Sequence, residues 1–419
     1  MMLATLAAAA RSRASSPAPL RPRVIFFVEG FTDIRFVVGL SRICDLTMIV
    51  PAQAYQASRL ADRVAASGAR LRVIEIPGGR LLFQILSAWR LWQHARGCDL
   101  ILSQELLRGS LNATLVGWLR RTPVIAYVGI SPLEYFQCRR ERRLIGPLAA
   151  WAGGAVIRAL ATINGRLATR CLAMGPYLRD VASQWCAHCE IGLYYGVDVE
   201  HFRPADADER LQLRARLDLP RNRFLVVLSS RISHEKDPET VLLAVAHARK
   251  RGLDAILLNL GDGDREFLAL PARLGIQDAA AWVLARPAVH PGGELADYFR
   301  TADAVALASL AEGAAYSTLE ALACATPVVA TAVGGMAVQL RGYASLTPRR
   351  DPDAMGDALL TIAANPAAAR AQADAGRDYV RREWSRDKAF ADLAQVLASV
   401  AKQAAVTADH VAASAGGRQ

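Results

Sequence analysis

The chain has 419 residues, of which 53% are hydrophobic, so it can bury large cores and is not a disordered polymer. A surplus of 50 Lys and Arg over 39 Asp and Glu gives a net charge of +11, which fits nucleic acid, an anionic membrane or a phosphorylated substrate. Residues 1–200 hold 24 basic and 13 acidic side chains, and residues 201–419 hold 26 of each. Because the second half is neutral and no basic-aromatic module is present, nucleic-acid binding is not expected.

The N-terminal segment does not have the order of a secretory signal. Residues 1–10 are apolar, but Arg11 and Arg13 follow this run, whereas a signal peptide has its basic residues first. Residues 1–22 are predicted to be a flexible lead. No later run reaches the ~20 apolar residues that span a membrane.

Seven cysteines, an odd number, are scattered through a long chain, which indicates a reducing compartment such as the cytoplasm. Cys186, His188 and Cys189 offer zinc-ligand types, but a closed zinc shell needs four ligands and no second pair lies nearby. We therefore expect ordinary packing before a strand and no metal site.

From residue 23 onward, short apolar runs alternate with helical patterns, which is typical of parallel sheets covered by helices. The first series has predicted strands at 24–28, 46–50, 71–76, 100–102 and 124–128 and helices at 34–43 and 84–95. The second has strands at 224–229, 255–260, 282–284, 304–308 and 328–330 and helices at 238–251, 294–300 and 318–324. The pattern predicts an α/β protein with two doubly wound domains, residues 23–200 and 201–383, facing a central cleft.

A cluster of arginines precedes the most apolar stretch of the first half. The cluster consists of Arg139, Arg140, Arg142 and Arg143, and the stretch is residues 145–163. One interpretation is a buried helix beside a solvated charge run. The other is an interfacial patch that docks peripherally on anionic lipid.

The segment after the strand at 224–229 carries Arg231 and Lys236 on a loop that enters a helix. Two cations with a helix N-terminus behind them can clamp a diphosphate. Alternatively they are surface cations, with Glu235 and Asp237 neutralising Lys236. After the next strand, Gly261 and Gly263 allow a close backbone approach to a nucleotide or form a simple tight turn.

The segment after the strand at 304–308 holds two glutamates, Glu312 in a loop and Glu320 in the first helical turn. Amides at such a helix start can receive a phosphate, and carboxylates can accept hydrogen bonds from sugar hydroxyls. Glu320 also has a structural interpretation, since Ser317 and Glu320 have the spacing of a capping box. Glu312 has no comparable local partner.

Together these motifs resemble the retaining glycosyltransferases of family four, which have the two-domain GT-B fold. The resemblance rests on the order of the Arg231–Lys236 loop, the Gly261–Gly263 turn, the 312–330 segment and a later glycine pair, Gly334 and Gly335. Residues 196–204 are similar to that family's interdomain segment. Residues 384–405 are similar to its last helix, which crosses back to the first domain, and 406–419 are expected to be a flexible tail.

The resemblance implies roles for individual residues. Arg231 and Lys236 would hold the donor diphosphate, with Gly261 and Gly263 in the adjoining turn. Glu312 would contact the donor sugar and, with Arg231 and Lys236, form the catalytic set. The remaining implied donor residues are Glu320, on the ribose, and Ala315, Tyr316 and Ser317, whose amides would cradle phosphate.

This chain departs from the family in both halves. Ala314 and Ala325 stand where the family usually has Phe and Gly. The family often has an acceptor-side histidine, but this chain has none between His94 and His188. Gly30, Asp33 and Glu105 are weaker acceptor-side candidates, and such acids are equally well explained as helix-start carboxylates.

The resemblance implies transfer of a sugar from a nucleoside-diphosphate sugar to a lipid-linked or surface-glycan acceptor, as in exopolysaccharide, lipopolysaccharide or glycolipid synthesis, with no cofactor and no metal. The alternatives are a GT-B nucleotide-sugar epimerase and a non-catalytic nucleotide-binding subunit. The expected location is the cytoplasm, with peripheral contact at the inner face of the membrane.

Overall fold

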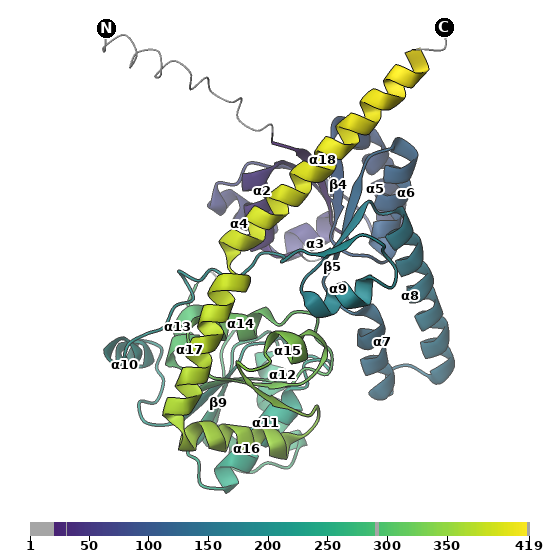
Figure 1. The fold of residues 1–419 in the computed structure, drawn as a ribbon. Helices are drawn as coiled ribbons and strands as arrows, with labels where there is room; N and C mark the ends of the chain where they lie inside the picture. The colour runs from purple at the N-terminus through teal and green to yellow at the C-terminus, as the bar shows by residue number, and fades with distance from the viewer. Residues whose placement is uncertain (1–20, 31, 290–292, 417–419) are drawn as a thin grey trace, which may run out of the picture. The chain divides into compact units, whose positions relative to one another are not determined.

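The computed structural model describes residues 21–30, 32–289 and 293–416, which form two parallel sheets flanked by helices (Figure 1). The strand orders are β3-β2-β1-β4-β5-β6-β7 and β10-β9-β8-β11-β12-β13. In each sheet the series starts in the interior and runs first to one edge and then to the other, which is the doubly wound, Rossmann-like topology. The predicted fold class is confirmed.

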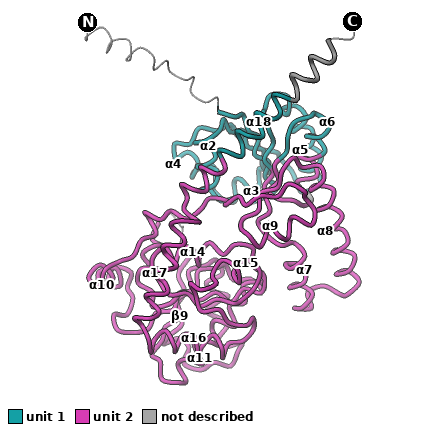
Figure 2. Tube along the Cα trace, in the orientation of Figure 1, with its two compact units in different colours: residues 1–102, 115–124, 394–419 teal, residues 103–114, 125–393 magenta. Residues whose placement is uncertain are grey.

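The chain divides into two compact units (Figure 2). Unit 1 comprises residues 1–102, 115–124 and 394–419, and unit 2 comprises residues 103–114 and 125–393. The predicted domain bounds describe a different division and stay predictions. Most of the predicted N-terminal lead, residues 1–20, lies outside the described residues.

Unit 1 contains parallel strands covered by helices. Its elements are β1 (Arg23–Phe27), α2 (Ile34–Ile43), β2 (Asp45–Pro51), α3 (Ala52–Ala57), α4 (Leu60–Ser67), β3 (Arg72–Ile76), α5 (Arg80–His94), nearly all of β4 (Leu100–Ser103) and the second half of α6 (Arg108–Arg120). β2 pairs in parallel with both β1 and β3. Residues 24–27 of β1 are all buried. A strand covered on both faces needs apolar side chains at every position, so these four residues form a continuous hydrophobic run.

Unit 2 begins with the second part of the first sheet. This part consists of β5 (Val124–Val128), α7 (Pro132–Glu141), α8 (Pro147–Leu167), β6 (Arg170–Ala173), α9 (Pro176–Ala182) and β7 (Cys189–Ile191). The strand predicted to follow the Cys186–Cys189 segment is β7, which already includes Cys189.

The second sheet of unit 2 is built from β8 to β13. Its elements are α10 (Ala207–Arg216), β8 (Phe224–Leu228), α11 (Pro238–Lys250), β9 (Ala255–Asn259), α12 (Asp264–Arg273), β10 (Val283–Ala285), α13 (Leu295–Thr301), β11 (Ala304–Leu307), α14 (Tyr316–Ala323), β12 (Val328–Thr331), α15 (Gly334–Gln339), β13 (Ser345–Thr347), α16 (Pro352–Ala364) and α17 (Pro366–Glu383). β9, β11 and β12 are buried along their whole length, so their carboxyl ends are held rigidly at one edge of the sheet.

The segment near residue 197 pairs with the start of the last helix. The Val197 N–H donates to the Trp384 carbonyl at 2.7 Å, and the Arg386 N–H donates to the Val197 carbonyl at 2.8 Å. A Cβ at Gly196 would lie 2.6 Å from the Arg386 Cα, so only glycine fits this crossing.

The last helix, α18, runs over Arg386–Gly416. It therefore extends past the predicted end at residue 405 into the predicted tail. The reason is its alanine-rich sequence, which has high helix propensity and contains no Pro or Gly before Gly416.

Candidate functional site

The predicted donor-site loops follow β8, β9 and β11, and hydrogen bonds join them at the edge where these strands end. The Ile232 N–H donates to the Asp262 carbonyl at 2.9 Å, and the Leu310 N–H donates to the Glu235 carbonyl at 2.7 Å. The carboxyl ends of parallel strands share one edge, so loops distant in sequence meet there.

Gly261 lets two of these loops touch. An added Cβ would lie 1.6 Å from the Ser230 carbonyl oxygen, which no side chain can accommodate. Gly263 has φ +93° and precedes α12, a conformation that favours glycine. The glycine pair thus positions the Arg231–Lys236 loop, and contact with a nucleotide stays a prediction.

Lys236 and Glu312 form an ion pair in which the Lys236 Nζ donates to Glu312 Oε2. The Ser309 hydroxyl, three residues earlier in the chain, donates to the same carboxylate oxygen at 3.1 Å, so the expectation that Glu312 has no local partner is wrong. The Lys236 and Glu312 side chains are 20% and 13% exposed, so both retain access to solvent and to a ligand. The structure therefore brings together two of the three predicted catalytic residues.

Arg231 instead faces its own loop, because its Nη2 donates to Glu235 Oε1 at 2.5 Å. Burial raises the pKa of the Glu235 carboxyl, but hydrogen bonds from its backbone N–H, the Ser233 hydroxyl and Arg231 outweigh burial and leave this pKa below its usual value. Arg231 is 61% exposed and can turn toward a ligand. Glu235 is thus the partner of Arg231, not of Lys236.

Asp237 is likewise engaged elsewhere, since Arg142 donates to its Oδ1 at 2.5 Å. Asp237 is 2% exposed, and the Thr240 hydroxyl donates to its other oxygen at 2.7 Å. The interpretation in which the acids beside Lys236 neutralise it is therefore wrong, because tertiary packing gives each of them another partner.

The start of α14 differs from the predicted capping box. The helix begins at Tyr316, with Ala315 preceding it and no side-chain cap, so Ser317 is not the N-cap. The Tyr316 hydroxyl accepts from the Tyr194 N–H at 3.1 Å, which anchors this end of the helix. Glu320 is only 2% exposed, and its role at a ribose stays a prediction.

Glycines also bring the Glu312 loop against neighbouring backbone. A Cβ at Gly313 would lie 2.5 Å from the Gly129 carbonyl oxygen, and one at Gly335 would lie 1.9 Å from the Gly313 carbonyl oxygen. The Gly335 N–H donates to the Glu312 carbonyl at 2.8 Å. The later glycine pair therefore holds the loop that carries Glu312.

Two residues near this loop were missed by sequence reasoning. The Tyr177 hydroxyl donates to Glu134 Oε1, and Glu134 Oε2 would lie 3.4 Å from a Cβ at Gly334. Burial, followed by this hydrogen bond, raises the pKa of Tyr177 well above its usual value. Glu134 lies in the first turn after β5, so inspection of each strand end for acids as well as histidines would have found it.

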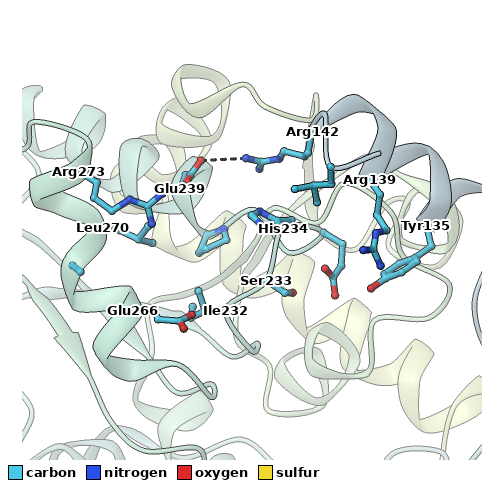
Figure 3. A pocket seen from close by; sticks show the side chains of 14 residues that line it. Tyr135, Arg139, Arg142, Ile232, Ser233, His234, Glu239, Glu266, Leu270 and Arg273 are labelled. Carbon is cyan, nitrogen blue, oxygen red and sulfur yellow. Dashed lines mark hydrogen bonds and ion pairs between the residues drawn. The ribbon is translucent and has the colours of Figure 1, made fainter. Parts of the chain in front are cut away.

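The Arg231–Lys236 loop also forms one wall of a pocket of about 640 Å³ (Figure 3). Arg139 and Arg142 line it from α7 and its end, and Arg273 lines it from α12. Arg142 is directed at Glu239, with a separation of 3.3 Å. Part of the predicted basic cluster is therefore engaged inside unit 2.

The structure places each of the three predicted acceptor-side residues near the end of a strand or the start of a helix. Asp33 caps α2 by accepting from the Arg35 N–H at 2.8 Å and also binds the Arg35 guanidinium, so it is a helix-start carboxylate. Gly30 is exposed, and an added Cβ there would meet no atom within 4 Å. Glu105 is half-buried after β4. Their part in acceptor binding stays a prediction.

Across the part of the chain that the structure describes, no group of three or more His, Cys, Asp or Glu side chains is placed to hold a metal ion. Metal independence remains an expectation. None of the helices among the described residues combines the length and apolarity needed to cross a bilayer.

Two solved structures have the same fold. Anabaena Alr3699/HepE in complex with UDP has a TM-score of 0.71 and 16% identity and covers 90% of this chain and 100% of its own. Sucrose-phosphate synthase from Thermosynechococcus elongatus has a TM-score of 0.68 and 18% identity, and the match covers 90% of this chain and 98% of the synthase chain. The two Rossmann-like sheets therefore define the GT-B fold of glycosyltransferases.

Residues 209–379 match the family model of glycosyl transferases group 1, so the chain carries a domain of that family. A D-inositol 3-phosphate glycosyltransferase of Xylanimonas cellulosilytica is 34% identical over 220 residues, 50% of this chain and 51% of the relative. One of Catenulispora acidiphila is 35% identical over 185 residues, 41% and 43% of the two chains. This chain spans about half the length of the curated relatives it matches. The predicted resemblance is confirmed for residues 209–379, which match the glycosyl transferases group 1 model.

Proposed function

We propose that this chain is a retaining, metal-independent glycosyltransferase that moves a sugar from a nucleoside-diphosphate sugar to a lipid-linked or surface-glycan acceptor. The observation that carries the proposal is the Lys236–Glu312 pair at the ends of β8 and β11, inside a glycosyltransferase group 1 domain. The pair offers a cation to a diphosphate and, beside it, a carboxylate to sugar hydroxyls.

Arg231 and Lys236 are assigned to the donor diphosphate, and Glu312 to the donor sugar. Ala315, Tyr316 and Ser317 are assigned to the phosphates because helix-start N–H groups lack intrahelical partners and favour anions. Glu320 is assigned to the ribose. Anabaena HepE has been solved with UDP and with UDP-glucose, which supports uridine nucleotides as the first donors to test.

In the proposed reaction, an acceptor hydroxyl oxygen bonds to the anomeric carbon while the bond from that carbon to the β-phosphate oxygen breaks. The hydroxyl proton passes to the departing phosphate on the same face of the sugar, which retains the configuration and requires no protein base. Lys236 and Arg231 stabilise the negative charge that develops on the diphosphate. Asp33, which is already bound by its own helix and Arg35, is poorly suited as a base.

The location that we propose is the cytoplasm at the inner face of the membrane. All seven cysteines are free thiols, as in a reducing compartment. The proposed peripheral contact uses the cluster Arg139, Arg140, Arg142 and Arg143, although Arg142 is bound to Asp237 and Glu239 and so contributes less. Exposed apolar side chains on the following helix α8, among them Leu148 and Trp151, support this patch.

The proposal is tested by titrating the purified chain with UDP, GDP, ADP and their sugars, followed by transfer assays with each bound donor. The acceptors are lipid-linked glycans and, because the curated relatives are named for it, inositol 3-phosphate. Binding of a nucleotide sugar and transfer with retained anomeric configuration are expected. Epimerised donor without transfer would indicate the epimerase, and nucleotide binding without turnover would indicate the non-catalytic subunit.

A further inference from the structure

Two helices of unit 1 expose an unusual set of large apolar side chains. On α5 these are Leu81, Leu82, Ile85, Trp89 and Trp92, and on the second half of α6 they are Leu115, Trp118 and Leu119. Ile85 is 69% exposed and Trp118 is 64% exposed. Single exposed apolar residues are ordinary, but large contiguous patches mark interaction sites.

Helix α5 is apolar on two opposite faces. Phe83 and Leu91 are buried beneath it, so that face supplies the packing that holds the helix on the sheet. Leu81, Ile85 and Trp89 are spaced four residues apart and therefore lie along the other face. This second face is exposed in the folded chain, so packing within unit 1 does not account for its hydrophobicity.

The two helices present one surface, which we name the α5–α6 face: the exposed apolar side chains given above. The Arg120 guanidinium lies 3.6 Å above the centre of the Trp92 ring and donates to the Trp92 carbonyl at 3.0 Å. The Thr122 hydroxyl donates to the Ala95 carbonyl at 3.2 Å. These contacts join the C-terminal ends of α5 and α6, which Figure 1 draws near each other.

The segments that carry this face have no acidic side chain, and the carboxylate of Glu29 reaches α5 from another element, where it accepts from Gln84 at 2.7 Å. Residues 80–98 and 106–133 contain no Asp or Glu. Arg80, Arg90, Arg96 and Arg121 are exposed on or beside the two helices. The α5–α6 face is thus an apolar surface rich in tryptophan with a basic rim.

We propose that the α5–α6 face docks on an anionic lipid bilayer, with its Trp, Leu and Ile side chains in the interfacial region and its arginines on the lipid phosphates. Tryptophan favours the membrane interface, and arginines beside an apolar helix face add attraction to anionic headgroups. This surface shares no residue with the Arg139–Arg143 cluster. The proposal does not rest on sugar transfer, because vesicle binding is measured without donor or acceptor.

The test uses the full chain and vesicles of phosphatidylcholine alone or with phosphatidylglycerol, with binding measured by co-sedimentation at low and raised salt. Binding to the anionic vesicles that weakens with salt is expected. The triple variant Ile85→Asn, Trp89→Asn, Trp118→Asn should bind at least about tenfold more weakly, because each side chain loses its buried area. Its circular dichroism should match the wild type, since all three positions are exposed.

The matched control is Leu211→Asn with Leu268→Asn, two exposed leucines on helices α10 and α12 of unit 2. This variant should bind vesicles as the wild type does. The variant Arg140→Glu, Arg143→Glu separates the two surfaces. It should retain at least half of the wild-type binding because neither arginine belongs to the α5–α6 face, and loss of most of the binding would make the arginine cluster the main contact and overturn the proposal.

A second measurement tests the proposal even if the triple variant misfolds. Brominated phospholipid should quench the tryptophan fluorescence of the wild type, and Trp89→Phe with Trp118→Phe, which keeps the surface apolar, should reduce this quenching. Wild-type binding in the triple variant, or no vesicle binding by the wild type, would overturn the proposal. So would a dimer in solution that only the triple variant abolishes, because the face would then be an interface with a second copy.

Discussion

Lys236 and Glu312 are 76 residues apart in the chain and form an ion pair at the edge of the second sheet. The order of residues around Lys236 does not predict this pair, because the acids that flank it in sequence are closer candidates. Glu235 instead binds Arg231, and Asp237 binds Arg142. Packing of the loops after β8 and β11 thus leaves one cation and one carboxylate together at the place where the proposed donor binds.

Lys236→Ala should weaken UDP binding by about tenfold to a hundredfold, since a charge-assisted hydrogen bond to phosphate contributes about 1.5–3 kcal/mol. The fold should be kept because the side chain is only partly buried. Isothermal titration calorimetry measures the affinity, and Lys250→Ala, at the exposed end of α11, is the matched control. An unchanged affinity in Lys236→Ala would remove this residue from the diphosphate site.

Glu312→Gln should lower kcat/KM for sugar transfer by about a hundredfold, because a carboxylate accepts stronger hydrogen bonds from sugar hydroxyls than an amide does. UDP, which lacks the sugar, should bind equally well or more tightly, since Lys236 loses the charge that neutralises it. Steady-state kinetics and UDP titration are compared, with Glu266→Gln as control. Loss of UDP binding together with activity would show that the residue acts on the nucleotide instead.

Ala325 has φ +54°, and it stands where the family usually has glycine. The left-handed conformation costs a non-glycine residue about 1–2 kcal/mol, which offsets the entropy that a glycine loses on folding. Ala325→Gly should therefore be about 1–2 kcal/mol less destabilising than Ala321→Gly within α14. Both alanines are 0% exposed, so each variant removes one fully buried methyl group. Urea unfolding gives the comparison, and equal losses at the two sites would contradict it.

Glu235 makes stability depend on pH in the acid range. Its folded-state pKa is below the ordinary value of 4.5, so its stabilising contribution is complete above that value and is lost as the pH falls through the folded pKa. Glu235→Gln should be less stable than the wild type near about pH 7, with the difference shrinking toward about pH 3. Urea unfolding across this range measures it, with Asp374→Asn on exposed α17 as control. A difference that stays constant with pH would mean that packing, not charge, is lost.

The alternation of apolar runs and helical patterns is enough to predict the strands at the centre of both sheets. Residues 224–229 and 255–260 were predicted as strands, and β8 and β9 occupy Phe224–Leu228 and Ala255–Asn259. A parallel strand buried on both faces is a continuous hydrophobic run, so its position is visible in the composition alone. β13, Ser345–Thr347, was missed because it is short and polar at both ends, so it has no apolar run like that of β10 (Val283–Ala285), which was predicted.

The ion-pair partners in the candidate site and the start of α14 depend on contacts between segments that are distant in sequence. The residue types at Arg231, Lys236 and Glu312 already indicated phosphate and sugar recognition. The ion pair between Lys236 and Glu312 depends on how the loops after β8 and β11 pack, so it is visible only in the structure. Ser317 matches a capping box locally, whereas α14 begins earlier, at Tyr316, whose hydroxyl accepts from the Tyr194 N–H. Side-chain type and spacing govern local propensity and burial, while the choice of an ion-pair partner depends on which loops the sheet topology brings to the same edge.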